Sequence, residues 1–313
     1  METYIAVRSH GLKTKLLTKK DYIAIVKGER TLTEYEAYTS IEEKDSLLVK
    51  IEKVFKVFNE RLALLRKLAG KYEDLVCAYP DILEVENLKF KLREISGRKV
   101  KPYLYPYSHH LSLDDIQSIV TEGDLWEKLS QTPYGKGVQK PEFITGVVDE
   151  KEAFLDSLYF SYARNVFLKA KRKFRNKLVE LLDREALVIL IYWSTVFKNR
   201  TKELISRGIL RGLIPVTIEF TEVKTEELIE AIGADLKEAE SYLESEEISR
   251  LILRLKILNQ KYYLKLAREH PTELPYVIYF LHLALNEALN IERILVGATL
   301  RIPEEEILSS LII

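Results

Sequence analysis

One pattern of helix, asparagine, glycine and proline occurs three times along the chain and limits what the chain can fold into. In each copy a long, charged amphipathic helix precedes a second helix, in which an asparagine lies among apolar residues. A glycine and then a proline follow. The asparagines are Asn87, Asn199 and Asn290, the glycines are Gly97, Gly208 and Gly297, and the prolines are Pro102, Pro215 and Pro303. Copies spaced by about a hundred residues indicate duplication of a supersecondary unit. We therefore expect three similar helical repeats, over residues 1–105, 106–212 and 213–313.

Apolar residues at steps of three and four predict helices through most of the chain. A first helix is expected around Tyr4, Val7 and Leu12. The long helices of the repeats and their partners are expected at about Glu43–Gly70, Gly70–Ser96, Lys151–Leu182, Arg184–Ser206, Glu246–Glu269 and Tyr276–Val296. One stretch, Gly212–Glu222, has a β-branched run typical of a strand. The predicted fold class is all-α.

Composition excludes several classes of protein. Lys+Arg and Asp+Glu are both 48, so the formal net charge is +0, which argues against nucleic acid as a partner. The single cysteine, Cys77, rules out a disulfide within the chain and favours a reducing, cytoplasmic setting. No apolar window reaches the roughly 18 residues that a membrane-spanning helix needs. We therefore expect no membrane span.

No residue set predicts catalysis, a cofactor or a metal site. The pair His109–His110 lacks ligand spacing, because adjacent side chains on a regular element point apart, and a loop or capping role is expected. Cys77 is interpreted as a small buried apolar residue. Each repeated asparagine is expected to hydrogen-bond backbone groups between helices and to set their register, with ligand contact as the alternative.

A run of basic residues in the second repeat is the largest cluster of one charge. It consists of Arg164, Lys169, Lys171, Arg172, Lys173, Arg175 and Lys177. Two interpretations stay open: a solvated helix face, or a surface that contacts anionic headgroups or acidic subunits.

The last forty residues carry the clearest likeness to a known family. Glu287, Asn290–Ile291, Gly297, Ile302–Pro303 and Glu306–Ile307 resemble the C-terminal end of the C-type subunits of archaeal-type (A/V-type) rotary ATP synthases, which are relatives of the d-type subunits of V-ATPases. Glu84, Asn87–Leu88–Lys89 and Gly97 are similar to the matching motif of the first unit, and the opening segment with Arg8 and Asp21–Tyr22 is similar to the start of the family. In the second repeat Val196 stands where the other two have glutamate, and Glu292 stands where a basic residue is expected.

This resemblance implies a shape and a role. Three repeats around a pseudo-threefold axis would form a funnel with a central cavity. The role that the resemblance implies is that of a non-catalytic socket on the cytoplasmic face of the membrane. It would lie between the proteolipid ring and the central shaft subunits of the D/F type. The resemblance thus implies a peripheral subunit that transmits torque for proton-driven ATP synthesis. A helical scaffold of another assembly remains the alternative, and an enzyme with a site between repeats is a third hypothesis.

Overall fold

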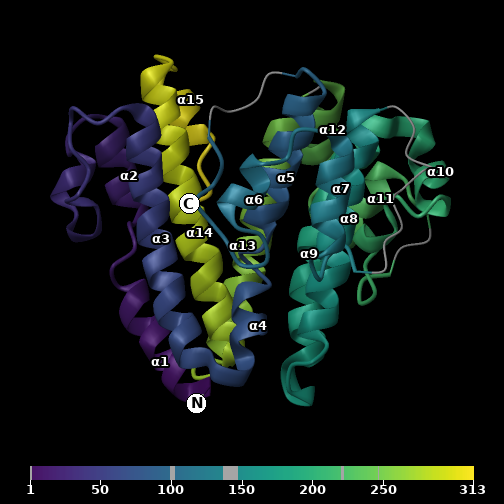
Figure 1. The fold of residues 1–313 in the computed structure, drawn as a ribbon, viewed down its shortest axis with the longest axis horizontal. Coiled ribbons are helices and arrows are strands. Elements are labelled where there is room, and N and C mark those ends of the chain that lie inside the picture. Colours follow the sequence, from purple (N-terminus) through teal and green to yellow (C-terminus); the bar gives the residue numbers. More distant parts are fainter. Residues whose placement is uncertain (1, 99–102, 137–146, 220–221, 246) are drawn as a thin grey trace. The chain divides into compact units, whose positions relative to one another are not determined.

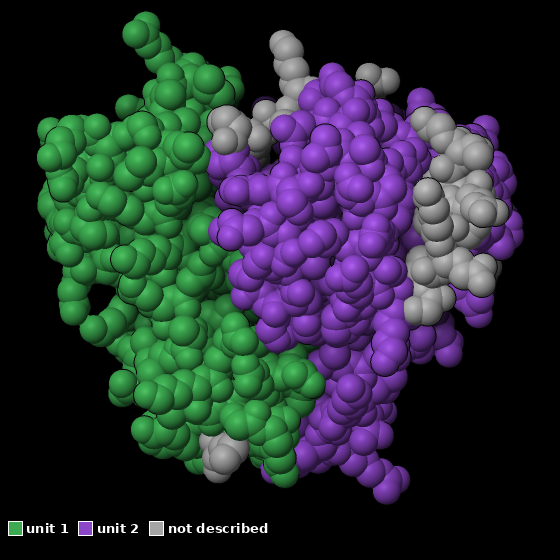
Figure 2. All heavy atoms as spheres, viewed as in Figure 1, with its two compact units in different colours: residues 1–80, 105–107, 263–313 green, residues 81–104, 108–262 purple. Residues whose placement is uncertain are grey.

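The computed structural model describes residues 2–98, 103–136, 147–219, 222–245 and 247–313, and every regular element in these ranges is a helix. Figure 1 shows the helices in chain order. The contacts divide the chain into two compact units, coloured separately in Figure 2. Unit 1 consists of Met1–Pro80, Tyr105–Tyr107 and Tyr263–Ile313, and unit 2 of Asp81–Leu104 and Ser108–Tyr262. The predicted all-α class is confirmed.

Unit 1 brings the two ends of the chain together. Its helices are α1 (Glu2–Lys13), α2 (Lys19–Val26), α3 (Leu47–Ala69), α4 (Glu73–Cys77), α14 (Leu274–Thr299) and α15 (Glu304–Ser309), with short 3-10 turns η1 (Leu32–Glu34), η2 (Glu36–Tyr38) and η3 (Gly70–Tyr72). Helices α1, α3 and α14 pack against one another, and α15 packs on α2 and α14. The core of α3 follows the predicted periodicity, because Ile51, Phe55, Phe58 and Leu62 are all buried.

Unit 2 is built on three helices that pack in sequence, α5 on α8 and α8 on α9. Its helices are α5 (Ile82–Ile95), α6 (Leu113–Gln117), α7 (Glu122–Ser130), α8 (Val148–Phe167), α9 (Arg172–Phe197), α10 (Thr201–Ser206), α11 (Thr225–Ala231) and α12 (Leu236–Glu244), with η4 (Lys198–Arg200) and η5 (Arg211–Leu213). Helix α13 (Ile248–Glu269) contains the boundary between the two units. At η5 the chain approaches α8 so closely that a Cβ on Gly212 would lie 2.0 Å from the Ser157 carbonyl oxygen. This contact requires glycine.

The helix boundaries predicted for the second repeat are wrong. The expected break at Asp183 does not exist, because Asp183 is buried in the middle of α9. The chain reverses instead between Phe167 and Arg172, where no glycine or proline marks the turn. The reversal lets Val166 and Phe167 on α8 and Phe174 and Leu178 on α9 become buried together in unit 2. Burial of these side chains decides the position of the turn.

Three smaller predictions are also corrected. The predicted first helix is present as α1, but its buried face is not the expected one, because Tyr4 and Val7 are 59% and 56% exposed and Ile5, Ala6 and Ser9 are buried. The helix expected after Gly70 is two helices, α4 and α5, separated at Tyr79 and Pro80. The described part of the strand-like stretch, residues 212–219, forms a 3-10 turn and bends. Pro102 lies outside the described residues.

The three-repeat division into residues 1–105, 106–212 and 213–313 stays a prediction. The two compact units reflect which segments contact each other, and superposability of three thirds is a separate property.

Candidate functional site

Glu287, a residue of the C-terminal motif, lies at the centre of a buried polar cluster in unit 1. Its carboxylate accepts hydrogen bonds from the Arg61 guanidinium at 2.5 Å, the Tyr38 hydroxyl at 2.6 Å and the backbone N–H of Leu17 at 2.5 Å. Burial, and next the charge of Glu287, raise the pKa of Tyr38 well above its ordinary value. Burial lowers the pKa of Arg61, but the charges and hydrogen bonds of Glu287 and Tyr38 together outweigh that effect, so the net shift is upward. The cluster joins α14 to α3 and to the segment after α1.

Glu84, the matching acid of the first motif, has a similar environment in unit 2. Its carboxylate accepts the backbone N–H groups of His109, His110 and Leu111 and the hydroxyl of Tyr134. The side chain is completely buried, and burial raises the pKa of Glu84. A carboxylate with several donors holds the loop after residue 107 against the first turn of α5.

A third buried acid, Asp183 on α9, was not singled out from the sequence. It accepts the backbone N–H groups of Val216 and Thr217, both at 2.8 Å, and the Arg164 guanidinium at 2.8 and 3.0 Å. Arg164 also donates to the carbonyl oxygens of Gly212 and Ile214. An ionised side chain inside a run of apolar helix positions is the signal that could have identified Asp183, because such a residue needs partners.

The three repeated asparagines have different environments. Asn290 is buried and pairs with the backbone of Ile312, donating to its carbonyl at 2.8 Å and accepting from its N–H at 3.0 Å. Asn87 is also buried. The expectation that Asn199 is buried within a helix is wrong, because this residue lies in the 3-10 turn η4 and is exposed. Since α9 ends at Phe197, this asparagine lies beyond the apolar stretch that would have buried it.

The three repeated glycines likewise differ. Gly97 and Gly208 have φ values of +71° and +84° and end α5 and α10 in left-handed turns, as expected of a C-terminal cap. Gly297 lies inside α14 and faces Ile307. The left-handed residue that ends α14 is Arg301, with φ +58°. The end of α14 has the same capping hydrogen bonds as the ends of α5 and α10. The N–H of Ile302 donates to the Gly297 carbonyl, and the N–H of Arg301 donates to the Ala298 carbonyl.

The basic run is divided by the turn between α8 and α9. Arg164 does not belong to a contact surface, as one interpretation of the basic run proposed. It is buried and pairs with Asp183. Arg175 and Lys177 are half-buried on α9. The remaining four, Lys169, Lys171, Arg172 and Lys173, are exposed at the turn, next to Leu168, which is 43% exposed. We call residues 168–173 the basic turn. No acidic residue occupies the first turn of α9. The positive charge of the basic turn therefore adds to the positive end of the dipole of α9.

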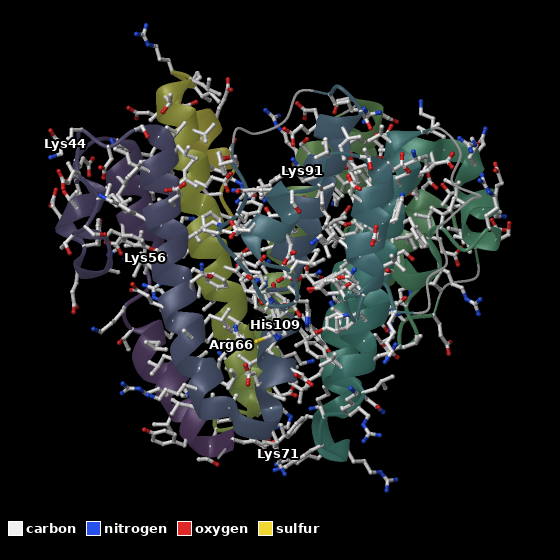
Figure 3. All side chains as sticks on the ribbon, viewed as in Figure 1. Lys44, Lys56, Arg66, Lys71, Lys91 and His109 are labelled. Atoms are coloured by element: carbon white, nitrogen blue, oxygen red, sulfur yellow. The ribbon has the colours of Figure 1, made fainter. Side chains whose placement is uncertain are left out.

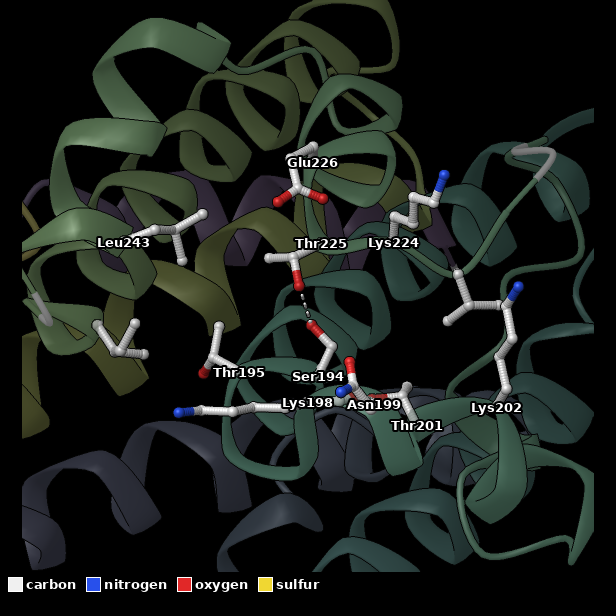
Figure 4. Close-up of a pocket in the computed structure, with 12 residues that line it drawn as sticks. Ser194, Thr195, Lys198, Asn199, Thr201, Lys202, Lys224, Thr225, Glu226 and Leu243 are labelled. Atoms are coloured by element: carbon white, nitrogen blue, oxygen red, sulfur yellow. Dashed lines mark hydrogen bonds between the residues drawn. The ribbon is translucent and has the colours of Figure 1, made fainter.

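A second polar region of unit 2 is a hollow of about 800 Å³ beside η4. Its lining includes Asn199, Lys198, Lys202 and Lys224, and Figure 4 shows Ser194 and Thr225 pointing toward each other, with their hydroxyls 3.0 Å apart. Lys224 pairs with Glu222 at 2.6 Å. We assign no ligand to this hollow.

Cys77 and the adjacent histidines complete the residues considered from the sequence. Cys77 is fully buried on α4, which confirms its interpretation as a small apolar residue. His109, labelled in Figure 3, lies with His110 beside Asp81. The loop role predicted for the pair agrees with their position between Ser108 and the start of α6.

Comparison with known families decides the membership of this chain. The sequence model of the family described as ATP synthase (C/AC39) subunit matches residues 5–310. The chain belongs to this family. Membership of the C/AC39 family makes it a component of a rotary ATP synthase and connects it with ATP synthesis and ion transport. No curated protein matched the chain. Among the described helices of this C/AC39 protein, none combines the length and apolar character needed to cross a membrane.

Proposed function

We propose that this C/AC39 protein is a non-catalytic socket that couples the membrane proteolipid ring to the central shaft and transmits torque between them. The family match over residues 5–310 is the observation that carries the proposal. The protein would be peripheral, on the cytoplasmic face of the membrane, with the proteolipid ring and D/F-type shaft subunits as partners. We also keep the arrangement of three repeats around a central cavity as part of this proposal.

The internal construction of the two units supports a mechanical role. Long helices are joined to distant segments by buried, charge-assisted hydrogen bonds at Glu84, Asp183 and Glu287. Such bonds to ionised groups contribute more to stability than neutral ones. A part that transmits torque has to resist local unfolding, which happens most easily where contacts are few.

The basic turn supports a contact with the membrane side of the complex. Four cations and an exposed leucine within residues 168–173 suit a surface that carries both anionic headgroups and apolar groups. We therefore propose that the basic turn, together with the flanking Arg175 and Lys177, faces the ring and the lipid around it.

Co-purification in mild detergent tests the socket. The tagged chain is expected to retain both the proteolipid ring and a shaft subunit, and to co-fractionate with membranes only when the ring is present. Retention of neither partner would contradict the proposal. Retention of soluble partners alone would instead favour a scaffold of another assembly.

A further inference from the structure

Among the described residues, three potential metal ligands gather in unit 2: Asp81, His109 and His110. Nδ1 of His109 lies 2.9 Å from Oδ1 of Asp81, and Nε2 of His110 lies 3.5 Å from Oδ2 of the same carboxylate. One ligand atom from each residue lies within 4.8 Å of the others. The Asp81 side chain is fully buried, and those of His109 and His110 are 10% and 19% exposed. The group is therefore enclosed but lies near the surface.

The two histidines converge because they occupy a loop. On a strand their side chains would point to opposite faces, which is the reason against a metal site given from the sequence alone. In the structure the Glu84 carboxylate binds the consecutive backbone N–H groups of His109, His110 and Leu111. This contact curls the backbone around one point, and the two imidazole centroids lie 3.8 Å apart.

We propose that Asp81, His109 and His110 form a binding site for a divalent transition-metal ion, with zinc as the fitting ion. Imidazole nitrogen and carboxylate oxygen are ordinary zinc ligands, and this borderline donor set suits zinc better than magnesium or calcium. Ligand atoms on a tetrahedral zinc with bonds of about 2.0–2.2 Å lie about 3.3 Å from one another. The His109 nitrogen lies 2.9 Å from one Asp81 oxygen and the His110 nitrogen lies 3.5 Å from the other, and one ligand atom from each residue lies within 4.8 Å of the others. These separations are near the value for a zinc site, so side-chain movements of about an ångström make room for the ion.

The surrounding residues supply the supporting contacts that metal sites require. The Tyr162 hydroxyl donates to Oδ2 of Asp81 at 2.9 Å and lies 3.0 Å from Nε2 of His110. The ring of Tyr134 packs edge-on against His110, and its hydroxyl bonds Glu84. Contacts of this kind orient ligand side chains before the ion arrives. Zinc would displace the proton between His109 and Asp81, and water would complete the coordination.

A bound ion would join the start of α5, the loop at residues 108–112 and, through Tyr162, helix α8. It would act on the stability of unit 2 and does not depend on the proposed rotary role.

Zinc content and thermal stability of the full chain test the site. After chelator treatment and dialysis against Zn²⁺, the native chain is expected to retain one zinc per molecule, measured by mass spectrometry of the metal, and to melt at a higher temperature than without zinc. His109→Gln and His110→Gln should each weaken zinc binding at least tenfold and abolish the zinc-dependent rise in melting temperature. His270→Gln is the matched control, because His270 also contacts a carboxylate, Glu273 at 2.9 Å, outside the cluster. It should bind zinc as the native chain does.

A measurement on the native chain alone guards against variants that fail to fold. The ring ¹⁵N signals of His109 and His110 should shift on addition of zinc, and Co²⁺ should produce the visible absorption of a four-coordinate site. Absence of zinc binding by the native chain, or binding that leaves both ring signals unchanged, would show that the cluster is a hydrogen-bond network only and overturn the proposal.

Discussion

At the scale of single residues, buried acids determine how distant segments of this chain are held. Glu84, Asp183 and Glu287 each accept at least one backbone N–H from a segment outside their own helix, and each also binds a buried arginine or a tyrosine hydroxyl. A buried carboxylate is costly unless it is fully paired. Each acid therefore demands one local arrangement of its neighbours.

The pairing of Glu287 gives a direct prediction. In Glu287→Gln the Arg61 guanidinium, 8% exposed, loses its counter-charge while staying buried. We expect a loss of about 3–5 kcal/mol in the free energy of unfolding. Urea denaturation measures it. The matched control is Glu36→Gln, which removes an exposed ion pair with Lys15 and should cost less than about 1 kcal/mol. Equal, small losses in both variants would contradict a structural role for the Glu287 cluster.

A second residue-scale prediction concerns Arg301. This residue ends α14 in the left-handed region, with φ +58°. Glycines hold the equivalent position in two other helices, Gly97 after α5 and Gly208 after α10. A side chain is unfavourable there, so Arg301→Gly should stabilise the chain by about 0.5–1 kcal/mol in thermal or urea unfolding. Leu300→Gly is the control, because Leu300 has right-handed φ and gains nothing from glycine. A destabilised Arg301→Gly variant would show that the arginine side chain contributes more than its backbone costs.

At the scale of elements, short helices are attached to the units by caps and ion pairs. Helix α6 is capped by the preceding residue Ser112, whose hydroxyl and backbone N–H form a capping box with Asp115. Lys128 on α7 donates to the same carboxylate at 2.5 Å. One aspartate thus starts α6 and links it to α7.

The linkage predicts a pH dependence in the acid range. The hydrogen bond from Lys128, and next that from Ser112, lower the pKa of Asp115 to about 2. Because the pKa is depressed in the folded chain, its contribution to stability is complete above about pH 4 and is lost as pH falls toward about 2. The melting temperature of Asp115→Asn should therefore lie below that of the native chain at pH 6, and the gap should narrow between pH 4 and pH 2.

Asp114→Asn, at the neighbouring position on α6, controls for the general effect of removing a charge. At pH 6 the difference in melting temperature between Asp114→Asn and the native chain should be smaller than the difference for Asp115→Asn. A gap for Asp115→Asn that stays constant from pH 6 to pH 2 would contradict the depressed pKa.

At the scale of the whole molecule, the spacing of the buried acids bears on the proposed three repeats. Asp183 follows Glu84 by 99 residues and precedes Glu287 by 104 residues. These intervals are closer to equal than those between the repeated asparagines. We therefore interpret Asp183, and not Val196, as the second-repeat counterpart of the two glutamates. On this alignment Ala186 takes the place of Asn87 and Asn290, which is consistent with the exposed position of Asn199.

The basic turn carries the prediction that concerns the assembled complex. Reversing two exposed charges, in Lys171→Glu with Lys173→Glu, should weaken binding to a reconstituted proteolipid ring at least tenfold at low ionic strength. The loss should shrink with added salt. Lys44→Glu, which changes an exposed lysine that is 82% accessible, is the control and should bind normally. Sedimentation with ring-containing vesicles measures the effect, and normal binding by the double variant would place the ring contact elsewhere.

Much of the helical content and the core of this chain could be predicted from local pattern. The apolar periodicity of α3 and α13 agrees with the burial of Phe58 and Leu255, and a proline followed by glutamates is typical of a helix start, which is where α15 begins after Pro303. Helix-forming tendency and an apolar stripe act within a few residues, so they can be recognised without knowledge of the fold. The family resemblance, too, rested on such local motifs.

Tertiary structure alone decided the turn between Phe167 and Arg172, the burial of Asp183 and Arg164, and the meeting of His109 and His110 at Asp81. The turn and the meeting of the two histidines have no local signal. An acid among apolar helix positions marks Asp183 as a residue that needs partners, but the sequence does not show which distant segment supplies them. Sequence periodicity determined that this chain is helical and where most of its apolar faces lie. Long-range burial and charge pairing decided where the chain reverses and which polar residues come together, because those free energies exist only once the helices have packed.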